Sequence, residues 1–587
     1  MYSHHSEQIV DIEKLLAESA VTLRTGRNSR LPFLRLPVET LRQIVENVVP
    51  PLSEIRGNFR PFYRSNAMAL STLSPILHTC HKLRQIALSH ANLWRTVSSS
   101  SRYQLPALPL YGAADLDVPL IAIFDGSDHE SLLGDSKAMD VSRIQELHVL
   151  NLRIFRGRND AAEFRQHFGS AKFSALTSLS ISSVVTIGEE EPISLDKAPR
   201  LRHLVLQSVT FLPQSMLSNL THLALEGAIY EPTRHVMTAG LLSRCPNLES
   251  LAISYPGSAQ TAHVQPRPLL RPVVLNRLQR ISLQLSDIHD TLGQFYLSLF
   301  PIGNDQPRNV PIALQILNHH WRDISGNISV LLWHATRSAA SHLSLSMNPL
   351  PDHPPSGGLF IAISAVGPQG TFHIATLPFP YRGDTMGIGW DMTHGIVLMS
   401  LIGGAAHILP AVREVWLSGV HIDMDRHMHI AAAFKTSIYA LRALETIVFV
   451  EPPQGYPPTG PTLCLCPDAE RPSASPNLRT LRLVYGNDAR SGWAESPPVG
   501  GAMNQLDLSR MLGELETGAY GYLDTLLLEM RPGLDVSPED LERLERHFAT
   551  VERRYYVGRT PTMPLPDYCV EHYGGSGGTR SWLGSLW

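Results

Sequence analysis

Hydrophobic residues near the start of the chain recur at the three- and four-residue steps of amphipathic helices. Ile9, Ile12, Leu16 and Leu23 lie at near-heptad spacing with charged residues between them, which predicts a helix within residues 1–30. Fewer than three clean heptads favour a helix docked on its own domain over a coiled coil. The basic stretch behind it is interpreted as a solvated linker and not as an anion or nucleic-acid patch, because the chain as a whole is negatively charged.

Residues 31–97 are predicted to form a separate helical domain. Pro37 lies at the start of its first helix, where the missing N–H of proline costs nothing. Leu41 and Ile44 then fall on one helical face, and a second helix carries Cys80 and Ala87 at similar steps. A domain this small cannot bury much core, so we expect it to pack on the following domain or on a partner.

After a proline-rich connector at residues 98–140, the phrase Leu-x-x-Leu-x-Leu recurs with turn-rich or helix-like segments between its copies. Each phrase predicts a strand whose alternate side chains are buried. The middle section, residues 300–405, is hard to phase, and Leu314/Ile316 and Leu343/Leu345 are interpreted there as degraded copies. The ten clearer copies are Ile144/Leu147/Val149, Leu176/Leu179/Ile181, Leu201/Leu204/Leu206, Leu220/Leu223/Leu225, Leu248/Leu251/Ile253, Leu278/Ile281/Leu283, Val412/Val415/Leu417, Leu444/Ile447/Phe449, Leu478/Leu481/Leu483 and Leu523/Leu526/Leu528.

This phrase resembles that of leucine-rich repeats. The resemblance implies an α/β solenoid, in which stacked repeats share one core and offer a long concave binding surface. Regular repeats place an asparagine five residues beyond the second leucine, where this chain has Leu152, Val184 and Val209. We therefore expect irregular repeats with uneven curvature over residues 141–555, with loop insertions, followed by a tail at residues 556–587.

The composition and net charge limit the classes of protein to which this chain can belong. Of the 587 residues, 43% are hydrophobic and 17% charged, which excludes a largely disordered chain. The net charge of −4 gives no general attraction to nucleic acid or to an anionic membrane. The polar, acidic N-terminus is unlike a signal peptide. The uncharged stretch at residues 392–412 is only weakly hydrophobic, which favours a buried segment over a membrane span. We expect a soluble intracellular protein, cytoplasmic and/or nuclear, that binds neither nucleic acid nor membrane.

The sequence contains few candidates for chemistry. Five scattered cysteines do not form a disulfide framework, and Cys464-x-Cys466 lacks the second pair of a common zinc site. No phosphate-binding loop or nucleophile motif is present. An enzyme would need a convergent polar pocket that the sequence does not indicate. One set of polar residues alternates along the chain: His421, Asp423, Asp425, His427 and His429. On an extended strand they would face one side and could hold a metal. However, they follow a repeat phrase whose outward positions are naturally polar, which favours an ordinary exposed strand face. We predict no catalytic residues, no metal and no cofactor.

The helical domain carries a second resemblance. Leu36-Pro37-x-Glu39-x-Leu41-x-x-Ile44, followed by Cys80-x-x-x-Arg84-x-Ile86-Ala87 and Leu93-Trp94, resembles the F-box in the form found in fungal proteins. The match depends on the order of these parts and not on any one dipeptide. Two features depart from the family pattern: Leu83 stands where tryptophan is usual, and the loop between the first two helices is longer. Both departures leave the apolar pattern intact.

The resemblance implies a substrate receptor of an SCF-type ubiquitin ligase. The F-box would bind a Skp-family adaptor, and through it a cullin, while the repeat surface would capture an unknown protein substrate and other subunits would transfer ubiquitin. The alternative is a leucine-rich-repeat scaffold acting outside any ubiquitin ligase, whose helical domain only covers the apolar end of the solenoid. The residues predicted to bind the adaptor or to form the F-box core are Leu36, Pro37, Glu39, Leu41, Ile44, Cys80, Leu83, Ile86, Leu93 and Trp94.

Overall fold

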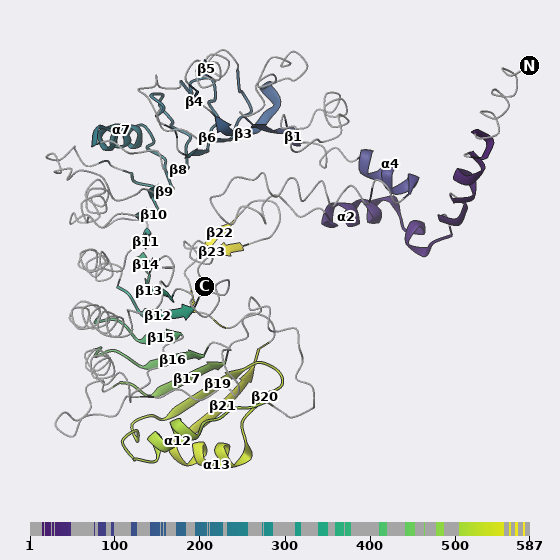
Figure 1. Ribbon diagram of the computed structural model, residues 1–587. Helices are drawn as coiled ribbons and strands as arrows, with labels where there is room; N and C mark the ends of the chain where they lie inside the picture. Colours follow the sequence, from purple (N-terminus) through teal and green to yellow (C-terminus); the bar gives the residue numbers. More distant parts are fainter. Residues whose placement is uncertain are drawn as a thin grey trace, which may run out of the picture. The chain divides into compact units, whose positions relative to one another are not determined.

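The structure, a computed structural model, is mixed α/β, with parallel sheets and a short helical stretch near the N-terminus (Figure 1). It describes residues 14–48, 80–89, 119–125, 141–159, 172–183, 194–226, 232–255, 273–285, 312–318, 339–349, 359–376, 410–418, 441–451, 477–485 and 504–556, with short gaps in some of these ranges, together with residues 76, 96–98, 463, 561, 563–564, 570–572 and 579–581.

The chain divides into two compact units. The N-terminal unit comprises Met1–Leu220 with His572–Arg580, and the C-terminal unit comprises Thr221–Glu571 with Ser581–Trp587. Each unit contains a mainly parallel sheet. The last two short strands, β22 (Val570–His572) and β23 (Thr579–Ser581), lie near the end of the chain.

Helices begin the N-terminal unit. Residues 14–16, 18–24 and 26–28 are helical, so the helix continues into the stretch that the sequence predicted to be a basic linker. The 3₁₀ helix η1 (Pro32–Arg35) precedes α2 (Val38–Val48), and α4 (His81–Ser89) packs against α2. Within this unit, η6 (Val141–Arg143) leads into the third strand of the sheet.

Five described strands form the sheet of the N-terminal unit, in the order β1-β2-β3-β6-β7, and every neighbouring pair is parallel. Between β3 and β6 the chain forms a small antiparallel pair, β4 (Ile154–Phe155) with β5 (Arg158–Asn159). The strands of the sheet are β1 (Thr96–Ser98), β2 (Leu120–Asp125), β3 (Ile144–Leu152), β6 (Ser178–Ser183) and β7 (His203–Gln207).

The sheet of the C-terminal unit runs β8-β9-β10-β11-β14-β13-β12-β15-β16-β17-β19-β21 among the described residues. Helix α7 (Pro232–Ser243) lies between β8 and β9 in the chain. The strands before the middle of the sheet are β8 (His222–Glu226), β9 (Ser250–Tyr255), β10 (Arg280–Leu285) and β11 (Ile312–Asn318). The strands beyond it are β15 (Glu414–Ser418), β16 (Thr446–Glu451), β17 (Thr480–Tyr485), β19 (Thr525–Met530) and β21 (Thr550–Tyr555).

The middle of this sheet departs from a simple succession of parallel strands. Here β12 (His342–Pro349), β13 (Leu359–Gly367) and β14 (Gly370–Thr376) form an antiparallel meander in reverse spatial order. As a result β14 lies parallel to β11, and β12 lies parallel to β15. This is the region that the sequence could not phase. Leu314 lies on β11 and Leu343 on β12, but the meander places β13 and β14 between those two strands.

The core lies on one face of each sheet and is built from the repeated phrase. All thirty residues of the ten phrases are buried, none more than 3% exposed. Parallel pairing brings equivalent positions side by side: Ile447 of β16 lies between Val415 of β15 and Leu481 of β17. Rows of apolar side chains therefore run across the strands. A pattern in which every second residue is apolar forms a continuous core in this way.

A tight turn precedes many of these phrases. The N–H of the first leucine donates to the carbonyl three residues earlier, as from Leu176 to Phe173 (3.3 Å) and from Leu248 to Cys245 (3.1 Å). Phe173 and Cys245 are themselves buried, and burial raises the pKa of the Cys245 thiol to about 12. The phrase is thus longer by one buried position than the sequence pattern suggested.

The end of the C-terminal unit is packed with two helices, α12 (Ser509–Leu515) and α13 (Pro538–His547) (Figure 1). The short strands β18 (Asn504–Gln505) and β20 (Leu534–Asp535) pair beside them. Helix α13 begins where the Ser537 side chain accepts a hydrogen bond from the Asp540 N–H (3.0 Å), with Pro538 in the first turn.

Candidate functional site

Helices α2 and α4 enclose a small apolar core of their own. Leu41 and Val45 of α2 are buried against Leu83, Ile86 and Ala87 of α4. Leu34 of η1 completes the buried set, and the Lys82 ammonium donates to the Leu34 carbonyl (2.5 Å). Leu83 therefore lies in the core of this helical pair.

Cys80 caps the start of α4. Its sulfur accepts from the N–H of Leu83 (3.5 Å), and its carbonyl accepts from the N–H of Arg84 (3.0 Å). A side-chain acceptor three residues before the donor is the geometry of a helix N-cap, here with sulfur, a weak acceptor. Cys80 is half-buried at the edge of the core, so its role here is in the local structure of the helix.

The sequence-predicted F-box residues divide by burial. Leu41, Leu83 and Ile86 lie in the buried core. Leu36, Ile44 and Cys80 are half-buried, while Pro37 and Glu39 are exposed. Leu93 and Trp94 lie outside the described residues.

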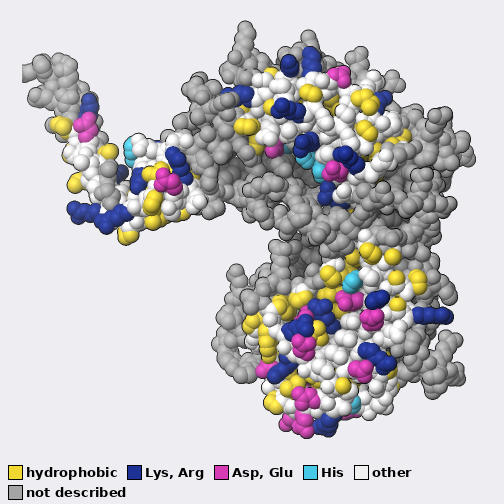
Figure 2. Space-filling model, turned by 180° about the vertical axis from the view of Figure 1, so that it is seen from behind, with side chains coloured by type: hydrophobic (Ala, Val, Ile, Leu, Met, Phe, Trp, Pro, Cys, Tyr) yellow, Lys and Arg dark blue, Asp and Glu magenta, His cyan; other side chains and the backbone are white. Residues whose placement is uncertain are grey.

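Three apolar residues around the Leu36-Pro37 pair face solvent. Leu31 is 47% exposed, Phe33 43% and Val38 39%. Figure 2 shows hydrophobic side chains on the surface of this helical part of the molecule. The sequence pattern did not identify these three residues as a surface feature. The available signal was that three hydrophobic residues lie within eight residues of chain around Leu36-Pro37, two of them ahead of the predicted helix.

A second cluster lies on the C-terminal sheet, on the face opposite the phrase core. Trp416 of β15, Val448 of β16 and Val484 of β17 are buried on this face. Val366 of β13 and Met563, from beyond the last strand of the sheet, belong to the same buried cluster. We call these five residues the Trp416 cluster. A sheet that is buried on only one face carries polar side chains on the other face. Here the Trp416 cluster places buried apolar side chains on that other face.

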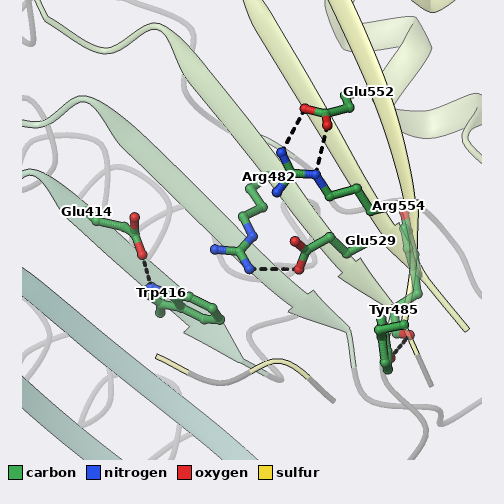
Figure 3. Close-up of polar contacts among 8 residues, drawn as sticks. Glu414, Trp416, Arg482, Tyr485, Glu529, Glu552 and Arg554 are labelled. Atoms are coloured by element: carbon green, nitrogen blue, oxygen red, sulfur yellow. Dashed lines mark hydrogen bonds and ion pairs between the residues drawn. The ribbon is translucent and has the colours of Figure 1, made fainter. Parts of the chain in front are cut away.

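Charged residues border the Trp416 cluster on the same face (Figure 3). The Arg482 guanidinium lies over the Trp416 ring, 4.8 Å from its centroid, and its Nη2 atom donates to Glu529 Oε2 at 2.7 Å. The Trp416 indole N–H donates to the Glu414 carboxylate. An arginine between an aromatic face and a carboxylate is held by a cation–π contact and a charge-assisted hydrogen bond together.

A serine and a histidine meet across β13 and β14. Ser364 and His373 lie directly opposite each other, and the Ser364 hydroxyl is 2.6 Å from His373 Nδ1. Both side chains are fully buried, and burial lowers the pKa of His373 to about 3. Serine with histidine is a pairing used in nucleophilic catalysis, but a substrate cannot reach this pair in the folded protein. The pair is therefore a buried cross-strand hydrogen bond.

Other sequence candidates fall largely outside the described residues. The alternating set from His421 to His429, the pair Cys464/Cys466 and most of the uncharged stretch at 392–412 lie there. Among the described residues, no three His, Cys, Asp or Glu side chains come close enough to hold a metal. No helix in the described part of the chain is both long and apolar enough to cross a membrane.

Comparison with known proteins adds no assignment: no family model matches the chain, and no curated protein is significantly similar to it.

Proposed function

We propose that this chain is the substrate-recognition subunit of an SCF-type ubiquitin ligase. In this proposal residues 31–97 are an F-box that binds a Skp-family adaptor, and residues 141–555 are an irregular leucine-rich-repeat-like solenoid that binds the target protein. The resemblance of the Leu36-Pro37 and Cys80–Ala87 segments to the F-box motivates the first half. The ten buried phrases on parallel strands support the second.

The observation that carries the proposal is the contrast between the inside and the outside of the helical pair. The core formed by the described residues of this pair does not include Leu31, Phe33 and Val38, which are exposed within eight residues of chain around Leu36-Pro37. Exposed apolar side chains gathered beside a buried core are typical of a protein–protein interface. An adaptor groove would cover them.

The experiment is co-purification of the tagged full chain with a Skp-family adaptor. The test variant is the double substitution Phe33→Asp, Val38→Asp, which places charge on the exposed side chains. Leu41→Asp is unsuitable because Leu41 is fully buried and its charge would disrupt the helical pair itself. The matched control is Met216→Asp, an exposed apolar residue of the same unit outside the helical pair.

We expect stoichiometric adaptor with the wild-type chain and with Met216→Asp, and at least tenfold less with the double variant. The thermal melt of the double variant should match the wild type because both side chains are exposed. Retention of the adaptor by the double variant would exclude this surface. A folded wild-type chain that recovers no adaptor would favour the alternative, a repeat scaffold outside any ubiquitin ligase.

A further inference from the structure

The Trp416 cluster lies on a face of the sheet that carries many polar side chains. Along the same face of β16, β17, β19 and β21, one row consists of Thr446, Thr480, Thr525 and Thr550, which are direct neighbours in register. The adjacent rows carry Arg482, Glu529 and Glu552. The buried apolar side chains on this face therefore gather at Trp416, Val448 and Val484. Charged and hydroxyl groups surround them, and the half-buried Leu527 lies between Arg482 and Glu552. This arrangement, a buried aromatic centre with a polar rim, is that of a binding hot spot.

A segment from beyond β21 already occupies this centre. The N–H of Tyr556 donates to the Met530 carbonyl of β19 (3.1 Å), and its hydroxyl donates to the Tyr485 carbonyl at the end of β17. The Tyr556 side chain thus reaches from the end of β21 past β19 to the end of β17. Met563 is then buried with Trp416, while its neighbour Pro564 is exposed.

The sequence around Met563 favours an extended conformation before it binds anything. Prolines stand at 561, 564 and 566, and a residue that precedes proline is restricted to extended backbone, as Met563 is. A segment of this kind loses little conformational freedom when it docks, and proline-rich extended peptides commonly dock on aromatic side chains. The unbranched methionine side chain also packs favourably against an aromatic ring.

We propose that the other four residues of the Trp416 cluster, Val366, Trp416, Val448 and Val484, form a peptide-binding site, and that Met563 with Pro561 and Pro564 is its intramolecular ligand. The external partner is an extended, proline-flanked segment of another protein that presents a methionine or leucine side chain in the place of Met563. Arg482, Glu529 and Glu414 border the site, and its apolar centre selects against a charged side chain because burying an unpaired charge is costly. The inference deepens the target-binding half of the proposed function by naming the class of target segment and its competitor within the chain.

The test is fluorescence anisotropy with a labelled synthetic peptide of residues 558–567, Gly-Arg-Thr-Pro-Thr-Met-Pro-Leu-Pro-Asp, added to the full-length chain. The chain carries Met563→Ala, which empties the site, and is compared with wild type. On the Met563→Ala background, Val450→Asp places charge on a half-buried residue packed against the cluster. Thr446→Asp is the matched control, on the same face of the same strand but outside the cluster.

We expect the peptide to bind the Met563→Ala chain at least tenfold more tightly than wild type. Val450→Asp, or methionine replaced by aspartate in the peptide, should abolish binding, whereas Thr446→Asp should not. A folded Met563→Ala chain that does not bind the peptide, or binds it no better than wild type, would show that Met563 is only a core residue. Adaptor recovery measured on the same proteins keeps this result separate from the adaptor half of the proposed function.

Discussion

At the scale of single residues, His373 gives the chain a defined sensitivity to acid. Burial holds its pKa at about 3, against an ordinary value of 6.5, so the folded protein keeps the ring neutral. Between these two pH values the unfolded chain binds a proton that the folded chain does not. The neutral His373 ring therefore makes its full contribution to the free energy of unfolding above pH 6.5, and this contribution is lost as the pH falls from 6.5 toward 3.

We predict that His373→Gln removes this acid sensitivity. Between pH 7.5 and pH 5 the wild type should lose about 2 kcal/mol of unfolding free energy through this residue, at about 1.4 kcal/mol per pH unit below 6.5. The variant should start less stable, and its deficit should shrink by about that amount at pH 5. Denaturant unfolding at both pH values measures the difference. His342→Gln, at a half-exposed histidine of β12, is the control, and a deficit that stays constant for His373→Gln would contradict the prediction.

At the scale of secondary-structure elements, the ion pair of Arg482 and Glu529 joins β17 to β19. Glu529 is buried, and Arg482 is shielded by the Trp416 ring, so solvent screens this pair only weakly. Removing one charge leaves the other without its partner in a poorly solvated site. Glu529→Gln should therefore cost about 1–3 kcal/mol of unfolding free energy.

A double-mutant cycle tests this contribution. Arg482→Met, Glu529→Gln and the double variant should give a coupling energy of at least about 1 kcal/mol in denaturant unfolding. The matched control is the pair Arg479 and Asp524, which precedes the same two strands at 3.7 Å with both side chains more than half exposed. Its coupling should lie near zero. Equal coupling in the two cycles would mean that burial does not strengthen the inner pair.

The strands could be predicted because burial of one face imposes a two-residue period that is visible in the sequence. The Val415/Leu417 and Ile447/Phe449 phrases identify β15 and β16 in this way. The order of β11, β14, β13, β12 and β15 could not be predicted, because backbone hydrogen bonds between strands carry no sequence signature. The environment of apolar side chains that belong to no repeated pattern could not be predicted either. Phe33 and Met563 contribute single hydrophobic positions, whose neighbours only the folded chain defines.

At the scale of the whole molecule, we expect the sheet of the C-terminal unit to transmit destabilisation mainly to neighbouring strands. Each described strand in it is hydrogen-bonded to at most two others, and the apolar rows connect one strand to the next. A local loss of packing should then open the adjacent strands first, because nothing in the described pairing links β17 directly to β8–β10.

Leu481→Ala provides the measurement. Leu481 of β17 is fully buried between Ile447 and Leu526, and truncating a buried leucine costs about 2–5 kcal/mol. Amide hydrogen exchange should accelerate in β16, β17 and β19 and stay unchanged in β8–β10. Leu251→Ala, at the equivalent buried position of β9, is the matched control and should reverse the pattern. Uniform acceleration across the unit in either variant would contradict the prediction. It would mean that the twelve described strands open together, so that contacts between neighbouring strands do not set the local stability around the Trp416 cluster.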